Sequence, residues 1–484
     1  MQKTKEPTLW HAFIPIIFLI VLLSLNVVIF GDAALDGSNQ IVLILAGAVA
    51  ALVASRLGIS WDDMIDGVVK SISSAMSSIL ILLLIGALAG TWLLSGIVPA
   101  MIYYGLQILN PAIFLFAACV VSAIVSLATG SSWSTIATLG VALLGIGQAL
   151  GISEGLVAGA IISGAYFGDK MSPLSDTTNL APAMAGTDLF THIRYMVYTT
   201  VPSLTLTLLI YIGIGVFSSS DGAVNDIEPI LASLSDKFDI NGWLFIVPAA
   251  VIFMIIRKVP AIPALLAGTL LGGVFAFIFQ PDIILEVAAI EGPLWKQTYV
   301  GVMKALYTDI NVVTDNAMVN ELLSTGGMSG MLNTIWLILC AMVFGGIMEA
   351  GGLLKKIAAE IIKRVNSTWS LITSTSATCV FFNITASDQY LAIVVPGRMY
   401  ADIYRERGLM PENLSRTLED SGTVTSVLVP WNTCGATQSS VLGISTFVYA
   451  PYCFFNIISP LMTIAFAVFN IKIRRYKEQK EAVA

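Results

Sequence analysis

A polar stretch from Phe167 to Pro182, FGDKMSPLSDTTNLAP, lies between two apolar runs and contains two carboxylates, a lysine, four hydroxyls and an amide. Pro173 lies near its centre. A proline inside a helix removes a backbone donor, clashes with the preceding turn and frees carbonyl groups. Carbonyl, hydroxyl and carboxylate oxygens are the ligands that small hard cations prefer. The stretch therefore predicts an interrupted helix that binds a cation.

A second stretch of this kind begins at Pro430, with the sequence PWNTCGATQ. Two shorter polar stretches, ATGSSWS at residues 128–134 and NITASDQ at residues 383–389, interrupt apolar regions elsewhere in the chain. The C-terminal ends of broken helices favour cations, and their N-terminal ends favour anions. We expect these four interruptions to converge on one oxygen-rich site.

Asp176 is the carboxylate that we expect to bind Na⁺. A carboxylate among apolar helices holds a proton more readily than one in water, and a bound Na⁺ opposes protonation. Such a group carries one ion or the other, which is the basis of antiport. Asp169 is the second candidate, and Lys170 either pairs with Asp169 or serves as a displaceable counter-ion to an emptied site. Ionisable residues inside a membrane are costly, so a function is the default interpretation.

Further polar residues lie close to these charges in the sequence. Asp388 is either a second Na⁺ site or a helix N-cap, and Glu419 and Asp420 are candidates for gate groups. The hydroxyls at residues 129–132 suit helix caps as well as ligands. The expected ion-binding or substrate-binding residues are Thr129, Ser131, Ser132, Asp169, Lys170, Ser172, Ser175, Asp176, Thr177, Thr178, Asn179, Asn383, Thr385, Ser387, Asp388, Asn432 and Thr433.

The composition indicates what kind of protein positions these residues. Of 484 residues, 56% are hydrophobic and 11% are charged, whereas about a quarter of the residues in a soluble domain are charged. Long apolar segments recur along the chain, so we expect an all-α polytopic membrane protein that forms a single transporter domain over residues 1–484. The two histidines and five scattered cysteines show no metal or disulfide pattern, and there is no HExxH or GxSxG motif. We therefore expect no cofactor and no enzymatic activity.

Runs of about twenty apolar residues mark the expected membrane spans. They are residues 12–30, 40–57, 74–97, 154–185, 193–217, 242–257, 261–279, 332–352, 411–445 and 446–470, of which 154–185 and 411–445 are interrupted. The regions 111–150 and 369–404 are each split by one of the short polar stretches, and neither turn contains lysine or arginine. We expect both to be re-entrant hairpins, because non-helical backbone at membrane depth is tolerated only against protein or a water-filled cavity.

The distribution of positive charge predicts the orientation of these spans. With the N-terminus in the cytoplasm, most of the 24 lysines and arginines fall on the cytoplasmic side, and the acidic segment Asp221–Asp239 falls outside. We therefore expect a multi-pass protein of the cytoplasmic membrane with both termini in the cytoplasm.

The two halves of the chain resemble each other. WDDMIDGVVKSIS at Trp61 matches WKQTYVGVMKALY at Trp295, and Pro173 corresponds to Pro430. Each half contains five expected spans and one hairpin, and an odd number of spans inserts the second half upside down. This is the inverted-repeat plan of secondary transporters, in which broken helices meet near the midplane. The expected segments are a first repeat at 12–217, an acidic extracytoplasmic connecting loop at 218–241, a second repeat at 242–471 and a basic cytoplasmic tail at 472–484.

The pattern GDKxSPxSDTT at Gly168–Thr178, with PWN at Pro430–Asn432, resembles the NhaC-type Na⁺/H⁺ antiporter family. The similarity covers nearly the whole chain. The resemblance implies a bacterial ion transporter with inverted repeats and re-entrant hairpins, which exchanges Na⁺ for H⁺ across the cytoplasmic membrane by alternating access. Some relatives in the same group instead exchange protonated malate for sodium and lactate.

Other functions are less favoured by the sequence. A sodium- or proton-coupled organic acid exchanger or an amino acid carrier could use the same scaffold, and Lys170 is the one cation near the first interruption that could bind a carboxylate. An ion channel usually needs a symmetric pore or a selectivity filter, which pseudo-symmetric broken helices do not suggest. The expected partners are Na⁺, H⁺ and the lipid bilayer, with a small organic anion as alternative cargo and a homodimer as an allowed assembly. No nucleic acid is expected.

Overall fold

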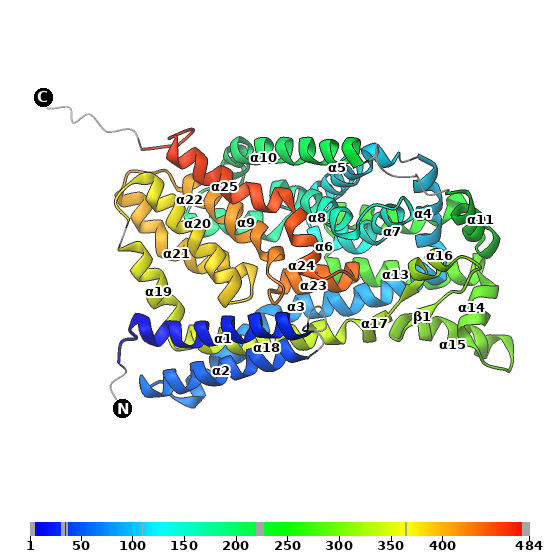
Figure 1. The fold of residues 1–484 in the computed structure, drawn as a ribbon, viewed down its shortest axis with the longest axis horizontal. Coiled ribbons are helices and arrows are strands. Elements are labelled where there is room, and N and C mark those ends of the chain that lie inside the picture. Colours follow the sequence, from blue (N-terminus) through cyan, green and yellow to red (C-terminus); the bar gives the residue numbers. More distant parts are fainter. Residues whose placement is uncertain are drawn as a thin grey trace, which may run out of the picture.

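The computed structural model describes residues 5–30, 34, 37–108, 110–218, 227–363 and 365–476. Residues 219–226 of the expected acidic loop and 477–484 of the expected basic tail lie outside the described residues. Figure 1 shows a bundle of helices, many of which run roughly along the long axis of the molecule. One short antiparallel pair, β1 (Ile310–Asn311) and β2 (Ser324–Thr325), accompanies the described helices.

The first half of the chain contains two helices, a long helix, a hairpin, an interrupted helix and a final long helix. Its elements are α1 (Leu9–Phe30), α2 (Ser38–Arg56), α3 (Trp61–Leu94), α4 (Ile97–Ile108), α5 (Pro111–Thr129), α6 (Ser132–Thr135), the π-helix η2 (Ile136–Gly140), α7 (Val141–Ala149), α8 (Glu154–Met171), α9 (Asp176–Ala185) and α10 (Leu189–Ser218).

The second half follows a similar order, with short helices and the strand pair inserted between its longer elements. Its elements are α11 (Glu228–Lys237), η3 (Gly242–Phe245), α12 (Ile246–Ile256), α13 (Ala261–Phe279), α14 (Pro281–Ala288), α15 (Leu294–Tyr307), β1, α16 (Ala317–Leu322), β2, α17 (Gly327–Gly330), α18 (Leu332–Ala350), α19 (Leu353–Ile362), α20 (Thr368–Thr385), α21 (Gln389–Glu406), α22 (Pro411–Leu418), the π-helix η4 (Glu419–Thr423), η5 (Ser426–Leu428), α23 (Thr433–Leu442), α24 (Thr446–Tyr449), η6 (Ala450–Tyr452) and α25 (Phe454–Val468).

Several of these helices are suited to cross a membrane. Among the described residues, seven helices are long and apolar enough, and two bent helix pairs meet the same criteria when each pair is taken together. The seven are α1, α2, α3, α5, α10, α13 and the continuous segment Gly327–Ala350. Their outer faces expose large apolar side chains such as Val28, Leu209 and Phe277, which hydrocarbon can cover. The chain is therefore a multi-pass membrane protein.

Several elements differ from the expected spans. The span expected over residues 446–470 bends by 54° between Tyr452 and Phe454. α3 begins at Trp61, well before the expected span start at residue 74. Ser60 caps this helix by accepting a hydrogen bond from the Asp63 amide at 3.1 Å, and acidic residues in a first turn interact favourably with the helix dipole. Its first turns are amphipathic, so a search for apolar runs does not detect them. α11 lies inside the segment expected to be a connecting loop. Its ten residues are too few for a search for apolar runs to detect.

Both split regions form helical hairpins whose turns contact the interrupted helices. The first hairpin, α5 with α6–α7, turns at Gly130, which has a φ of +73°, and a Cβ there would lie 2.6 Å from the Leu174 Cβ. Only glycine fits this turn without strain. The second hairpin, α20 with α21, turns at Ser387, whose carbonyl accepts a hydrogen bond from the Thr433 amide at 3.0 Å. Each turn therefore contacts the interruption in its own half of the chain.

Glycines hold α8 against α5. A Cβ at Gly164 would lie 2.0 Å from the Cys119 carbonyl oxygen, and one at Gly168 would lie 2.4 Å from the Ala123 carbonyl oxygen. Small residues at this four-residue spacing let the backbones of two membrane helices touch. The close approach brings Asp169, the next residue of α8, against the first hairpin.

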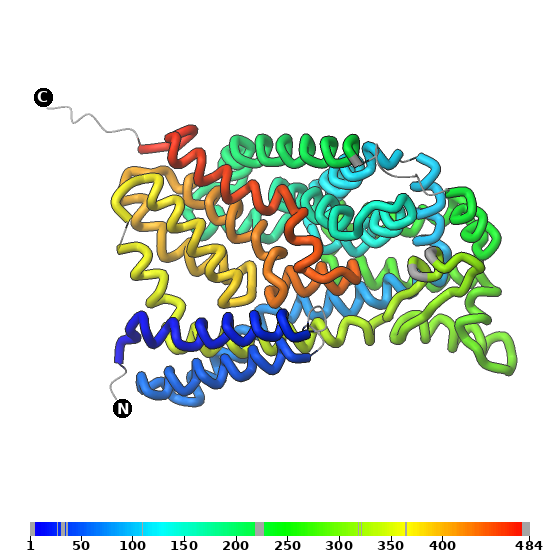
Figure 2. Tube along the Cα trace, in the orientation of Figure 1, coloured from blue at the N-terminus to red at the C-terminus, as the bar shows by residue number. Residues whose placement is uncertain are grey.

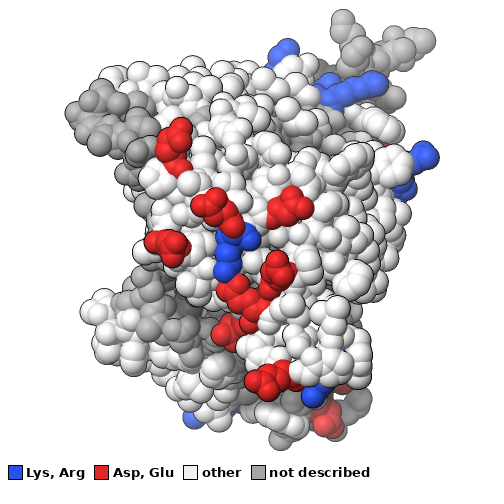
Figure 3. Space-filling view, turned by 90° about the vertical axis from the view of Figure 1, so that its right-hand side faces the viewer, with Lys and Arg blue, Asp and Glu red and all other residues white. Residues whose placement is uncertain are grey.

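The two ends of the molecule carry different parts of the chain. The start of α1 and the end of α25 lie at the same end (Figure 2). The opposite end contains α11, α14 and α15 (Figure 1), and its surface shows more acidic than basic side chains (Figure 3). Lys237 and Glu286 form an ion pair of 2.7 Å between α11 and α14. α11, from the segment expected to be extracytoplasmic, therefore lies at the end opposite the start of α1 and the end of α25.

Candidate functional site

A cavity of about 510 Å³ receives residues from all four interruptions. The first hairpin contributes Thr129, the first interrupted helix Asp176, the second hairpin Gln389 and the second interrupted helix Thr433. The further polar residues of its lining are Ser77, Ser78, Ser131, Ser134, Asp169, Ser175, Thr177, Lys258 and Tyr390. Segments far apart in the sequence thus meet around one oxygen-rich space.

Asp169 is the buried carboxylate of this cavity, with 7% of its surface exposed. Its Oδ2 accepts two hydrogen bonds from Ser132, one from the backbone amide at 3.1 Å and one from the hydroxyl at 2.6 Å. Hydrogen bonds to an ionised acceptor are stronger than those between neutral groups. Asp169 therefore ties α8 to the tip of the first hairpin and faces the cavity.

Asp176 lines the same cavity but is exposed. It is the first residue of α9, where the positive end of the helix dipole stabilises a carboxylate, and Ser175 caps this helix. The two carboxylates of the cavity therefore differ in environment, one buried against the hairpin and the other open to solvent.

Three of the expected ligands in the first interruption bind the backbone. The Thr178 hydroxyl donates to the carbonyls of Asp169 and Lys170 at 3.1 and 2.9 Å. The Asn179 amide donates to two carbonyls of the turn at 3.0 and 2.7 Å. The Ser172 hydroxyl accepts a hydrogen bond from the amide two residues ahead at 3.2 Å. These side chains satisfy the groups that the break leaves unpaired and fix the shape of the turn.

In the second half, the hairpin tip is bonded to the second interruption. The Asn432 side chain donates to the Asn383 carbonyl at 3.0 Å, and the Trp431 indole donates to the Ile384 carbonyl at 2.7 Å. Thr433, the next residue, reaches the cavity. The PWN motif therefore holds the second tip in place and lets Thr433 line the cavity.

The four expected ligands at the second tip, Asn383, Thr385, Ser387 and Asp388, do not line the cavity. Asp388 has the N-cap geometry, one of the two alternatives for this residue, and accepts a hydrogen bond from the Leu391 amide at 2.9 Å. The Thr385 hydroxyl donates to the Phe381 carbonyl at 2.8 Å. Ser131 caps α6 in a similar way at the first tip, but it also lines the cavity.

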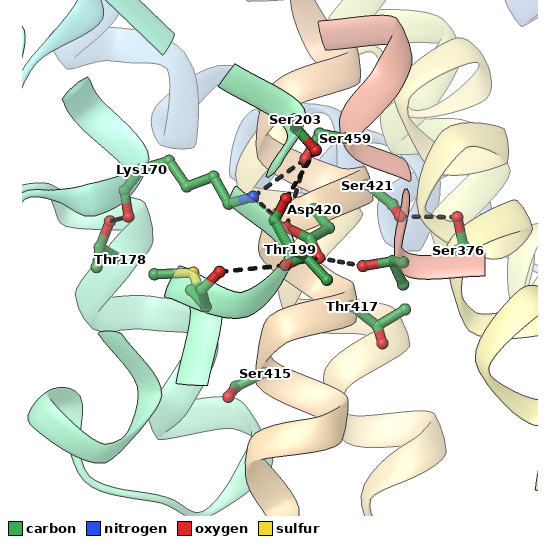
Figure 4. A network of polar contacts seen from close by, with 12 residues as sticks. Lys170, Thr178, Thr199, Ser203, Ser376, Ser415, Thr417, Asp420, Ser421 and Ser459 are labelled. Atoms are coloured by element: carbon green, nitrogen blue, oxygen red, sulfur yellow. Dashed lines mark hydrogen bonds and ion pairs between the residues drawn. The ribbon is translucent and has the colours of Figure 1, made fainter. Parts of the chain in front are cut away.

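Lys170 forms a buried ion pair with Asp420, 250 residues further along the chain (Figure 4). Its ammonium group also donates to the Ser459 hydroxyl of α25 at 3.1 Å. Of the two alternatives for Lys170, the ion pair with Asp169 is therefore wrong. Successive residues of a helix are about 100° apart around its axis, so Asp169 faces Ser132 and the cavity while Lys170 faces the second half of the chain.

Asp420 lies in η4 within a cage of donors. Besides Lys170, its carboxylate accepts hydrogen bonds from the hydroxyls of Thr199 at 2.9 Å, Ser459 at 3.3 Å and Thr463. A buried charge requires a partner of opposite charge and satisfied hydrogen bonds, and Asp420 has both. The network therefore joins α8 and α10 to η4 and α25.

The charges of α22 and η4 are more deeply buried than the sequence indicates. Arg416, Glu419 and Asp420 are all fully buried, and their spacing places them on one side of the helix. That spacing, within an expected span, was the available signal. The Arg416 guanidinium lies 4.5 Å from the centre of the Tyr195 ring. Within the described part of the chain, the charged atoms of Arg416 and Glu419 have no hydrogen-bond partner.

Residues 164–471 match the Na⁺/H⁺ antiporter family. This chain belongs to that family. The matched segment includes both interruptions, the second hairpin and the Lys170–Asp420 pair of this antiporter.

Three relatives match the antiporter over most of their length. The malate-2H⁺/Na⁺-lactate antiporter of Bacillus subtilis is 35% identical over 95% of this chain and 94% of its own. The Na⁺/H⁺ antiporter NhaC of Alkalihalophilus pseudofirmus is 35% identical over 92% of each chain. The arginine/ornithine antiporter ArcD of Halobacterium salinarum is 35% identical over 95% of this chain and 92% of its own. The solved structure of Neisseria gonorrhoeae MtrF aligns over 95% of each chain at 15% identity with a TM-score of 0.37, a likeness too remote to bear on function.

Proposed function

We propose that this antiporter exchanges Na⁺ for H⁺ across the cytoplasmic membrane by alternating access, with a cavity carboxylate that binds either ion. The observation that carries this proposal is the convergence of all four interruptions on one cavity that contains Asp169 and Asp176. Membership of the Na⁺/H⁺ antiporter family supports the choice of ions.

Asp169 is suited to bind the two ions alternately. A buried carboxylate is costly when it is ionised and unpaired, so it gains by taking up either a proton or a cation. Ser132 holds the carboxylate in position. Lys170 is paired with Asp420, and among the described residues no lysine forms an ion pair with Asp169. Asp176, at the exposed part of the cavity, is placed to attract the cation from solvent.

The order of elements supports an inverted repeat as part of this proposal. The pair α1–α2, the long α3, the first hairpin and α8–α9 correspond in order to α12–α13, α15 with α18, the second hairpin and α22–α23. An odd number of spans in each half turns the second repeat over, so the two hairpins enter the membrane from opposite sides. Lys258, which the positive-inside rule assigns to the cytoplasm, lines the exposed edge of the cavity. The structure then corresponds to an inward-facing state.

The size of the cavity favours a second candidate, the exchange of an organic cargo. Its 510 Å³ would hold on the order of ten water molecules, far more than a bare Na⁺ needs. Relatives are named for malate and lactate and for arginine and ornithine. Two carboxylates line the cavity and its lysine lies at the exposed edge, so a cationic amino acid fits the charge better than an organic anion does.

Purified protein in liposomes with an internal pH dye distinguishes these cargoes. The liposomes receive pulses of Na⁺, Li⁺ or K⁺ alone, and then the same pulses with malate, lactate or arginine. We expect proton movement with Na⁺ alone. Proton movement only in the presence of an organic compound would contradict Na⁺/H⁺ exchange and support the second candidate.

Asp169→Asn and Asp176→Asn test the carboxylates in the same assay. We expect Asp169→Asn to lower the Na⁺-dependent rate at least tenfold, because an amide cannot exchange a proton for a cation. Asp176→Asn should raise the Na⁺ concentration needed for half-maximal rate. Asp402→Asn, a control at an exposed carboxylate, should stay within twofold of wild type. Wild-type Na⁺-dependent transport rates in both cavity variants, with normal elution on gel filtration, would contradict the proposed site.

A further inference from the structure

A second cavity, of about 340 Å³, lies further along the helices that line the first. Its lining is mostly apolar, and its polar residues include Thr138, Gln148, Thr325 and Ser440. Thr325 belongs to β2, which pairs with β1, and β1 lies towards the end of the molecule that contains α14 and α15 (Figure 1). The second cavity therefore lies on the side of the acidic end.

Three parts of the chain line both cavities in the same order. In each part, the earlier residue lines the first cavity and the later residue lines the second. The pairs are Ile81 and Ile85 on α3, Ser134 and Ala137 on α6–η2, and Thr433 and Ser440 on α23. A helix rises 1.5 Å per residue, so the two linings are about 6 Å apart along α3 and about 5 Å apart along the hairpin. One helical turn thus separates the cavities at these two elements.

Two parts of the chain that line both cavities, α6–η2 and α23, carry buried polar atoms without partners among the described residues. The amide nitrogen and oxygen of Gln438 and the hydroxyl of Ser134 have no hydrogen-bond partner within the described part of the chain. Gln438 precedes Leu442 by one turn, and Leu442 lines the second cavity, so Gln438 lies on the same side of α23. Ser134 lines the first cavity. Buried polar atoms are nearly always paired, so these unpaired groups are available to a transient ligand.

We propose that the second cavity is the outer half of the transport path and that Ser134 and Gln438 form the polar part of the barrier between the two halves. This inference rests on the proposed exchange through the first cavity and adds the residues that the cargo passes on its way out. Neutral oxygen atoms can replace part of the water shell of a cation without holding it as a fixed charge would. The barrier therefore favours passage of a cation over its retention.

Cysteines introduced singly at Ser78, in the first cavity, and at Thr138, in the second, test the path in the full-length protein. The five native cysteines are buried, so the wild-type chain gives the background. A membrane-impermeant maleimide is added to right-side-out or inverted vesicles during turnover. We expect Ser78→Cys to react at least tenfold faster from the cytoplasmic side and Thr138→Cys from the outer side. Reaction of Thr138→Cys from the cytoplasmic side alone, or from neither side while the variant transports, overturns the path.

Gln438→Met tests the barrier, because it keeps the size of the side chain and removes its hydrogen-bonding groups. We expect the transport rate to fall at least tenfold while the two cysteine variants keep their sidedness in this background. Gln297→Met, a control on α15 outside both cavities, should change the rate less than twofold. A wild-type transport rate in Gln438→Met would show that Gln438 is not part of the transport path.

The labelling does not depend on the identity of the cargo. If Na⁺ moves no protons but Thr138→Cys reacts from the outer side, the choice of ions is wrong and the path is supported. If Na⁺ moves protons and Thr138→Cys does not react from the outer side, the function stands and the path is wrong.

Discussion

Lys170 and Asp420 connect the first half of the chain to the second at the level of single residues. Both are fully buried, and three hydroxyls complete the shell around the carboxylate. A buried ion pair adds little net stability compared with apolar residues of similar size, but the loss of one partner leaves an uncompensated charge. Each of the two charges therefore needs the other to remain buried without a large cost in folding free energy.

Removal of either charge alone should destabilise the antiporter strongly. We expect Lys170→Met and Asp420→Asn each to cost about 3 to 5 kcal/mol, seen as a lower midpoint of thermal unfolding in detergent. The double variant should be more stable than either single variant, because no isolated charge remains. A double variant that is less stable than both single variants would show that the two residues do not act as a pair.

At the scale of elements, the contact between α5 and α8 sets the position of Asp169. Gly164→Ala should separate the two helices, because its Cβ would lie 2.0 Å from a backbone carbonyl oxygen. We expect a lower folded yield and a weaker apparent affinity for Na⁺. Gly213→Ala is the matched control, because nothing lies within 4 Å of its Cβ, and alanine in a helix is favoured over glycine by about 1 kcal/mol. Equal yields and Na⁺ affinities in the two variants would count against this packing.

The sequence predicted the interrupted elements better than their partners. Pro173 and Pro430 mark breaks through local backbone chemistry, and both breaks are present. Asp420 was not identified as the partner of Lys170, because 250 residues separate them and no local pattern records which helices meet. Short helices such as α4 and α11 are not predicted, because their lengths fall well below the twenty residues of a span. Chemistry that depends on one segment could be predicted, and chemistry that depends on the meeting of two segments could not.

At the scale of the whole molecule, the positions of α1 and α25 bear on the orientation in the membrane. The start of α1 and the end of α25 lie at one end (Figure 2), and the acidic surface lies at the other (Figure 3). Because basic residues favour the cytoplasm, we expect a fluorescent protein that folds only in the cytoplasm to be bright at either terminus. The same protein inserted within residues 218–227 should be dark. A bright insertion would reverse the assigned orientation.

Asp169 and Lys170 are neighbours in α8, yet they bind to different sides of it: the first to Ser132 in the hairpin and the second to Asp420 in η4. A twist of α8 about its own axis would stretch both links at once. A displacement of the first hairpin relative to η4 would therefore strain α8 at both bonds. In the proposed exchange, a cation that binds Asp169 therefore acts on a helix that is bonded to both halves of the molecule.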